Sequence, residues 1–176
     1  PWNDADALLE HAESFGEVTA AIIVNPLDQG PLVPTTAASP EFVAAIHAVR
    51  ERWGAAIVLD SVRHGFRLHP DGCQHAIGLE PDLLTMGKAL GNGHAISAAL
   101  GVESLRKAAR RILFTSTYMF ESPPMRAATK VLELYDRDDV FAHIRTIGER
   151  LCEGLRAAAA EAEQAIVLSG PPTMPS

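Results

Sequence analysis

Two residues in the middle of the chain could do chemistry together, the carboxylate of Asp60 and the amine of Lys88. Asp60 directly follows the apolar run 55–59, and Lys88 follows a second apolar segment and lies among glycines at positions 87, 91 and 93. An acid at the end of a buried strand needs solvent or a cationic partner, and a helix cap or loop ion pair would also explain it. A lysine flanked by apolar residues can form an imine through its uncharged amine, although a surface lysine beside a turn has the same local sequence.

As a pair, the two residues suit pyridoxal phosphate. The lysine would hold the cofactor aldehyde as an imine, and the carboxylate would keep the pyridine nitrogen protonated, so that the ring accepts electrons. Two opposite unit charges in contact gain on the order of 4 kcal/mol at an effective dielectric constant of 20. No G-x-G-x-x-G follows the first predicted strand, and GNGHAISAALG (91–101) fits no phosphate-binding fingerprint. A Rossmann-type nucleotide binder is therefore not favoured.

The elements that must position this pair follow an α/β pattern. The sequence predicts a helix at 3–11, a strand at 18–24 buried on both faces, a loop at 27–40, and a second buried strand at 55–59. Between the two strands, Ser39 and Pro40 begin a helix that Gly54 ends. Strand, helix and strand in this order predict a βαβ unit with a parallel sheet.

The rest of the chain continues this pattern and then becomes helical. We predict strands at 83–86 and 95–100, a short basic helix at 104–111, and further short strands at 112–114 and 165–168. The two long predicted helices cover 125–135 and 140–163.

Composition limits the classes of function. The chain has 176 residues, 47% of them hydrophobic, with a formal net charge of −7, which predicts a globular domain and argues against binding to nucleic acid or to an anionic membrane. No apolar run approaches the 18 residues of a membrane span, and no leader is visible at the start. Two cysteines are too few for a disulfide framework, so we expect a cytoplasmic protein.

The two segments that hold the pair resemble a known family. DSVRHGFR (60–67) and PDLLTMGKALGNG (81–93) resemble the signatures D-E-V-x-x-G-F-R and P-D-x-x-x-x-G-K-x-x-G-x-G of class III aminotransferases, and look closest to the branch with glutamate-1-semialdehyde 2,1-aminomutase. These are fold-type I pyridoxal-phosphate enzymes. The resemblance implies a mainly parallel sheet flanked by helices, with 1–137 as part of the cofactor-binding large domain. Residues 138–176 would be a connecting helix and the start of a truncated small domain.

The resemblance also implies roles for single residues and for partners. The enzyme would be a homodimer that acts on a small-molecule amino donor and a carbonyl acceptor. The segment 114–133 resembles the stretch where a threonine of one subunit reaches the cofactor phosphate of the other. The implied residues are Lys88 for the imine and proton transfer, Asp60 for the pyridine nitrogen, Val62 for the ring face, and Thr117 with Ser116 beside it for the phosphate, Thr115 being an alternative in register to Thr117.

This sequence also departs from the family pattern. Ser61 stands where the family has Glu, and Asn25 precedes Pro26 where the family usually has Glu-Pro, which bears on the substrate. The glycine-serine phosphate loop of the family is absent from these residues. A non-catalytic fragment or scaffold core therefore stands beside the aminotransferase or aminomutase as a second hypothesis. A visible absorbance that borohydride abolishes would distinguish the two.

Other polar residues have simpler interpretations. His69, Cys73 and His75 lie close enough in sequence to suggest a metal site, but no second ligand pair follows at a zinc-like spacing, so a polar loop is favoured. His64 is expected to be a solvated loop histidine, although it could approach substrate.

Two arginines and two further features complete the candidates. Arg63 and Arg67 could bind a substrate carboxylate bidentately, or pack against Asp71 or other local acids. Cys152 is expected in the core, and the basic residues of 106–111 are expected on a solvated helix face.

Overall fold

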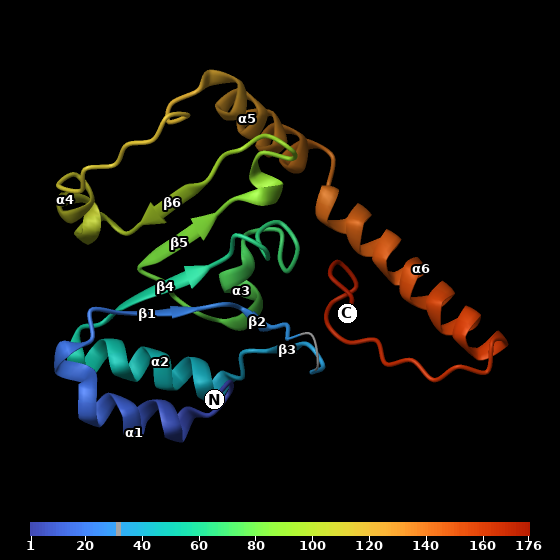
Figure 1. Cartoon of the computed structure of the whole chain (residues 1–176), viewed down its shortest axis with the longest axis horizontal. Helices are drawn as coiled ribbons and strands as arrows, with labels where there is room; N and C mark the ends of the chain where they lie inside the picture. Colours follow the sequence, from blue (N-terminus) through green and yellow to red (C-terminus); the bar gives the residue numbers. More distant parts are fainter. Residues whose placement is uncertain (31–32) are drawn as a thin grey trace.

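A four-stranded sheet runs through the centre of the molecule (Figure 1). The computed structural model describes residues 1–30 and 33–176. The strand order is β1-β4-β5-β6, in which β1, β4 and β5 are parallel and β6 is antiparallel to β5. The strands are β1 (Ala21–Val24), β4 (Ala56–Asp60), β5 (Leu83–Met86) and β6 (Ala98–Gly101). The predicted mainly parallel sheet is confirmed.

The βαβ unit forms as its sequence signals predict. The hydroxyl of Ser39 accepts a hydrogen bond from the N–H of Phe42 at 3.1 Å, and Gly54 ends the helix in the left-handed region at φ 73°. The first predicted strand, 18–24, is shorter than expected, because Val18 ends a 3-10 helix and the strand begins only at Ala21. The elements of this region are α1 (Ala5–Phe15), η1 (Gly16–Val18), the small antiparallel pair β2 (Leu27–Asp28) and β3 (Thr36–Ala37), and α2 (Pro40–Trp53).

The core lies between α2 and one face of β1 and β4. Ile46 of α2 and Ile57 and Leu59 of β4 are 0% exposed. Ile23 of β1 is 72% exposed, so the prediction that this strand is buried on both faces is wrong. Successive strand residues point to opposite sides, and α1 and α2 lie together on one side (Figure 1).

Beyond β4, strands β5 and β6 alternate with short helices, and two long helices follow. The predicted strands at 112–114 and 165–168 are wrong: the structure gives neither of them a ladder partner, and apolar β propensity alone does not form a strand. The remaining elements are α3 (Cys73–Ile77), η2 (Lys88–Leu90), η3 (Glu103–Leu105), α4 (Arg106–Ala109), α5 (Ser122–Arg137) and α6 (Val140–Glu161).

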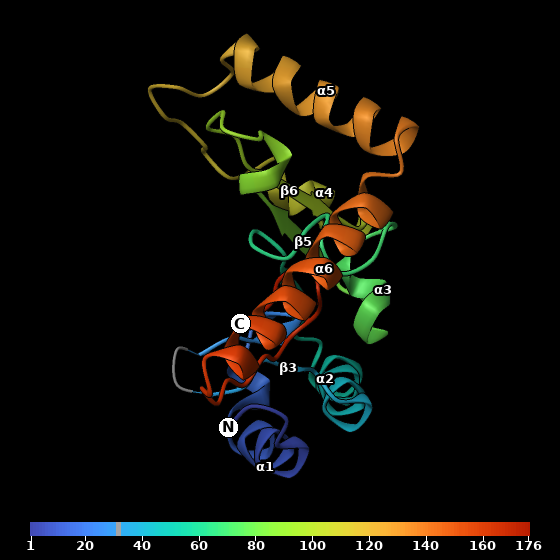
Figure 2. The ribbon, with the colours of Figure 1, turned by 90° about the vertical axis from the view of Figure 1, so that its right-hand side faces the viewer.

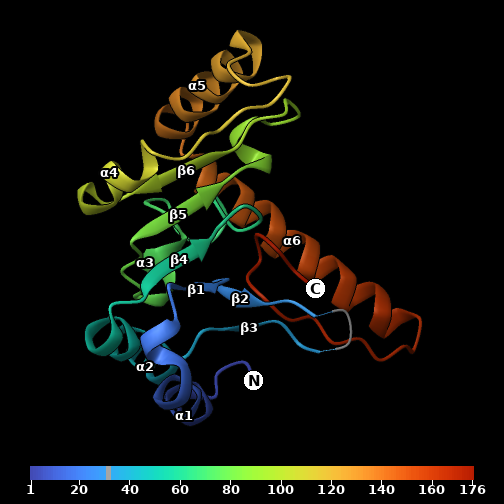
Figure 3. The same ribbon diagram turned by 60° about the vertical axis from the view of Figure 1, so that its left-hand side comes forward.

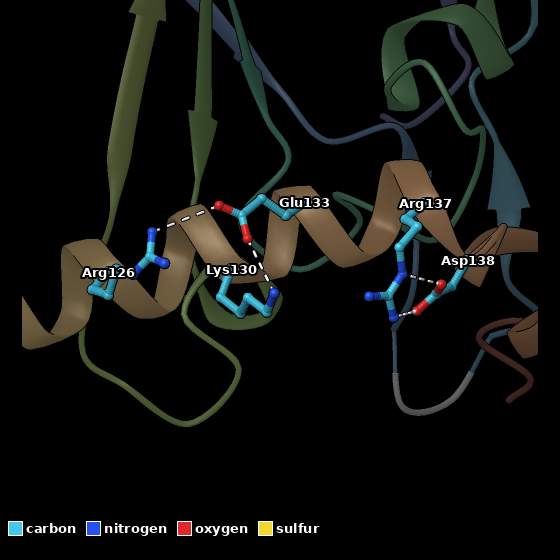
Figure 4. Close-up of polar contacts among 5 residues, drawn as sticks. All are labelled: Arg126, Lys130, Glu133, Arg137 and Asp138. Atoms are coloured by element: carbon cyan, nitrogen blue, oxygen red, sulfur yellow. Dashed lines mark hydrogen bonds and ion pairs between the residues drawn. The ribbon is translucent and has the colours of Figure 1, made fainter.

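The two long helices frame the sheet on different sides. Helix α5 lies beyond β6, and α6 runs past the carboxyl ends of the parallel strands (Figures 1 and 3). Figure 2 shows α6 in front of the sheet when that edge faces the viewer. On α5, Glu133 pairs with Lys130 at 3.1 Å and with Arg126 at 3.6 Å on an exposed face (Figure 4).

The last residues fold back from α6 toward the β2–β3 region (Figure 1). The N–H of Thr35 donates to the hydroxyl of Ser169 at 2.9 Å. Gly148 of α6 lies directly against this returning segment, because a Cβ at that position would lie 1.8 Å from the carbonyl oxygen of Pro172. None of the helices among the described residues is both long and apolar enough to cross a membrane.

Candidate active site at the carboxyl edge of the sheet

Asp60 and Lys88 come to the same edge of the sheet. Asp60 is the last residue of β4 and pairs in register with Thr85 of β5, and Lys88 follows β5 after one glycine. The carboxylate is half-buried, and its Oδ1 accepts hydrogen bonds from the N–H of Val62 at 3.0 Å and from the hydroxyl of Thr85 at 3.2 Å. The carboxyl ends of neighbouring parallel strands are where α/β sheets bind ligands.

The two residues after Asp60 shape the turn. Ser61 is 1% exposed, and its hydroxyl donates to the carbonyl oxygen of Thr85 at 2.7 Å, which ties the end of β4 to β5. Val62 lies against Gly87, where an added Cβ would be 3.4 Å from the valine Cγ1. Val62 therefore lies beside the residue that precedes Lys88.

Lys88 begins a short 3-10 helix and has a left-handed backbone, at φ 43°. Such a conformation costs a residue other than glycine about 1–3 kcal/mol, and these conformations cluster at functional sites. The side chain is exposed and lines a cavity of about 330 Å³. Its wall includes Gln29, Arg63, Arg67, Lys88, Thr173 and Met174.

His64 is buried at this site, so its predicted place in a solvated loop is wrong. The N–H groups of His64 and Gly65 both donate to the carbonyl oxygen of Ser61, and this tight turn brings the ring inside, where it is 3% exposed. Burial lowers the pKa of His64, with Arg63 and Lys88 acting in the same direction and Asp60 opposing them. The ring is therefore neutral at neutral pH, and we assign its proton to Nε2, which lies 3.1 Å from Oε1 of Gln29.

Arg67 holds the returning C-terminal segment. Its guanidinium donates to the carbonyl oxygen of Thr173 at 3.2 Å, and the hydroxyl of Thr173 donates back to the carbonyl oxygen of Arg67. The alternative that Arg67 packs against Asp71 is wrong, since Asp71 contacts His69 at 3.8 Å instead. Thr173 follows Arg67 by 106 positions, so no local pattern could have predicted this contact.

Ser116 and Thr117 lie elsewhere in the same chain. Both are exposed on the segment between α4 and α5, and neither lines the Lys88 cavity. This segment leaves α4 at one end of the sheet and reaches α5 at the other (Figure 1). Their role in binding phosphate across a subunit interface stays a prediction.

The segment with His69, Cys73 and His75 is more ordered than a polar loop. Cys73 begins the short helix α3 and is 1% exposed, and burial raises the pKa of its thiol. The rings of His69 and His75 lie 5.4 Å apart. Within residues 1–30 and 33–176, no three His, Cys, Asp or Glu side chains are grouped to hold a metal ion.

Two other sequence interpretations are confirmed. Cys152 is buried on α6, at 8% exposure. The basic residues of 106–111 are exposed, and Arg106 pairs with Glu103 at 3.2 Å.

Comparison with known proteins decides the family. Residues 4–169 match the family model of class-III aminotransferases. The chain belongs to this family. Aminopentol aminotransferase of Sphingopyxis macrogoltabida is 32% identical over 174 residues, covering 99% of this chain and 41% of the relative. Glutamate-1-semialdehyde 2,1-aminomutase of Desulfatibacillum aliphaticivorans is 31% identical over 173 residues, which cover 96% of this chain and 40% of the relative.

Solved structures of other proteins share the fold. The FumI protein of Sphingopyxis sp. MTA144, in its PLP internal aldimine form, superposes with a TM-score of 0.93 at 32% identity, over 99% of this chain and 42% of that chain. Ornithine aminotransferase of Plasmodium yoelii superposes with a TM-score of 0.77 at 22% identity, over 97% of this chain and 45% of that chain. This second likeness is one of fold alone. The chain thus spans about two fifths of the length of the relatives it matches.

Proposed function

We propose that this chain contains the catalytic lysine, Lys88, of a pyridoxal-phosphate-dependent aminotransferase or aminomutase. The observation that carries this proposal is the placement of Asp60 and Lys88 at the adjoining carboxyl ends of two parallel strands. Membership of the class-III aminotransferase family supports it. Its substrates would be a small-molecule amino donor and a carbonyl acceptor.

The residues at this edge fit such a cofactor. Lys88 is exposed to the cavity, where an aldehyde can reach its amine. Both hydrogen bonds to the Asp60 carboxylate go to Oδ1, and Oδ2 accepts none within the part of the chain that the structure describes. Gly87 has no side chain, so the backbone that leads to Lys88 can lie close to Val62, where an added Cβ would be 3.4 Å from the valine Cγ1.

Asp60, Lys88 and Val62 would each have a different role toward this cofactor. Pyridoxal phosphate, when bound, supplies an aldehyde for the amino group and a ring that accepts electrons from the neighbouring carbon. Asp60, whose Oδ2 is not hydrogen-bonded to any described residue, would hold the proton of the ring nitrogen in place. Lys88 Nζ would take the proton from the substrate carbon that bears the amino group and pass it to the carbon of the cofactor's former aldehyde. Val62 would pack against one face of the ring.

Two substitutions test the proposal. Both are made in the complete natural protein that contains this sequence. Lys88→Ala should lower turnover at least about 10³-fold, because one amine supplies both covalent capture and proton transfer. Asp60→Asn should keep the cofactor yet lower turnover by about 10²-fold, through loss of the charge on the ring nitrogen. Lys107→Ala, on the exposed helix α4, is the control and should leave turnover unchanged.

Three outcomes would count against the proposal. Wild-type turnover in Lys88→Ala would reject the reactive lysine, and wild-type turnover in Asp60→Asn would reject the role of the carboxylate. A wild-type protein with no visible absorbance from bound cofactor and no turnover would instead support the non-catalytic scaffold.

We also propose that the protein works as a homodimer in which Thr117, with Ser116 beside it, reaches the partner's cofactor phosphate. The surrounding segment supports this with apolar side chains that no neighbour covers: Leu113 is 89% exposed, Phe114 74% and Phe120 76%. A symmetric pairing would bury both copies of this segment and complete two sites at once.

Subunit exchange tests this arrangement. Lys88→Ala and Thr117→Ala proteins are mixed under conditions where exchange is confirmed. In a mixed dimer one site carries both lesions and the other carries neither, so activity should rise above that of both parents. No rise would show that Thr117 does not act across the interface.

The domain division and the location remain proposals as well. Residues 1–137 would belong to the large domain, and 138–176 would lead into the small one, which agrees with the break between α5 at Arg137 and α6 at Val140. A cytoplasmic location is supported by the two cysteines, Cys73 and Cys152, which are both free and buried.

A further inference from the structure

The cavity beside Lys88 collects positive charge. Arg63, Arg67 and Lys88 all line it, and no carboxylate does so among the described residues. Three cationic side chains around about 330 Å³ favour an anionic ligand, since an oxyanion would offset their mutual repulsion. The question is which of these side chains is available to bind it.

Arg67 is already engaged. Its guanidinium donates to the carbonyl oxygen of Thr173, and Thr173 returns a hydrogen bond to the carbonyl oxygen of Arg67. Arg63, by contrast, makes no hydrogen bond and no ion pair through its side chain with any residue that the structure describes. Of the two arginines, Arg63 is the one whose fork of N–H donors remains to be used.

A second donor is held beside it. The ring of His64, 3% exposed and neutral, directs Nε2–H to Oε1 of Gln29. Since that oxygen is occupied, the amide NH₂ of Gln29 is left for another acceptor, and Gln29 lines the same cavity as Arg63 and Lys88. The buried ring thus acts as a positioning residue for an amide donor.

We propose that Arg63, together with the amide of Gln29, binds the carboxylate of the substrate while Lys88 acts on a carbon near it. This inference rests on the proposed function and names its substrate class: amino acids and oxo acids in preference to simple amines and aldehydes. A guanidinium matches a carboxylate with two parallel hydrogen bonds, which fixes the substrate's orientation as well as its charge. The cofactor phosphate is the other oxyanion that such donors could bind.

The first measurement compares a carboxylate with its uncharged amide. The cofactor-loaded protein is titrated with propionate and with propionamide, and both dissociation constants are measured by nuclear magnetic resonance. Wild type should bind propionate at least about tenfold more tightly, and Arg63→Met should bring the ratio close to one. Arg63→Lys should fall between the two. The control Arg110→Met removes an exposed arginine on a different surface and should keep the wild-type ratio.

The second measurement separates substrate from cofactor. Wild type and Arg63→Met are titrated with pyridoxal phosphate and with pyridoxal, which lacks the phosphate. The proposal expects the ratio of these two affinities to be unchanged in Arg63→Met. A selective loss of pyridoxal phosphate binding would assign the guanidinium to the phosphate and overturn the proposal. So would a wild type that does not prefer propionate, or an Arg63→Met that keeps the preference. Failure of wild type to bind pyridoxal phosphate at all would instead reject the proposed function.

Discussion

The region from α1 to η2 holds nearly all the buried apolar side chains of the described residues, whereas the region after η2 leaves most of its own in solvent. Ile46 and Ile57 are 0% exposed, but Leu113 is 89% exposed. After Leu90, the buried apolar side chains among the described residues are Ala128 and Cys152 alone. The site lies where the two regions meet, because Lys88 follows the last parallel strand, β5, and Thr173 returns to the same cavity from beyond α6.

This difference in burial indicates that the two regions have different roles. The first region can position Asp60 and Lys88 through its own sheet and core. The second region supplies one wall of the cavity and an apolar surface that needs covering, which fits the proposed dimer. Substitutions in the two regions should therefore differ in kind as well as in size.

The largest contrast should come from removing an apolar side chain in each region. Ile57→Ala should lower the free energy of unfolding by about 2–5 kcal/mol, since it empties a fully buried site between β4 and α2. Leu113→Ala should change that free energy by no more than about 0.5 kcal/mol in the monomer. Urea denaturation at low protein concentration measures both. Equal losses would contradict the division into two regions.

A smaller loss of stability should follow from a substitution on α6 where the C-terminal residues 170–176 pack against it. Gly148→Ala places a Cβ 1.8 Å from the carbonyl oxygen of Pro172, so residues 170–176 must shift, at about 1–3 kcal/mol. Gly154 is the matched control on the same helix, with nothing within 4 Å, and Gly154→Ala should stabilise the protein by up to about 1 kcal/mol. Thermal unfolding and the rate of proteolysis at the C-terminal segment measure the pair. A Gly148→Ala protein as stable as Gly154→Ala would show that the segment does not rest on α6.

The next contrast concerns pH and compares the buried His64 with the exposed His143. Burial holds the pKa of His64 below its ordinary value of 6.5 in the folded state. As pH falls below 6.5, the unfolded chain takes up this proton before the folded chain does, so stability decreases until the pH lies below the folded pKa. His64→Gln should make stability fall less steeply over this window, and His143→Gln should not. Urea denaturation at several pH values measures the slopes, and an unchanged slope in His64→Gln would contradict a buried neutral ring.

The smallest effect is expected on the solvent face of α5. The hydrogen bond from Lys130 lowers the pKa of Glu133, and Arg126 adds a weaker attraction (Figure 4). Exposed pairs of this kind contribute little and are screened by salt. Glu133→Gln should therefore leave the melting temperature almost unchanged. Any difference should disappear in about 0.5 M NaCl, because the salt screens the exposed charges. A marked fall that persists in salt would mean that this face is covered in the folded protein.

Much of the first region was predictable because its signals are local. Ser39, Pro40 and Gly54 mark the ends of α2 through their own backbone preferences, and the apolar runs at 55–59 and 83–86 predict the strands after which Asp60 and Lys88 come together. The resemblance to class III aminotransferases predicted the family, which is confirmed. The roles that it implied for Asp60, Val62, Lys88, Ser116 and Thr117 stay predictions.

The rest depends on contacts that a sequence pattern does not encode. The burial of His64 follows from a tight turn at Ser61 and from Gln29, 35 positions earlier. Gln29 itself gave no signal, since a lone amide in a loop has no periodicity or motif. The segment 112–114 has strand-like residues, but a strand needs a neighbouring edge and none pairs with it in the described structure.

The most direct test of the account is the identity of the lysine that captures the cofactor. The complete natural protein is loaded with pyridoxal phosphate, reduced with borohydride, digested and mapped by mass spectrometry. The account predicts that the mass of the reduced cofactor appears on the peptide that contains Lys88 and that Lys88→Arg abolishes it. These residues hold two other lysines, Lys107 and Lys130, both exposed on helices away from the cavity. A label on either of them, or on a lysine outside this sequence, would contradict the central claim.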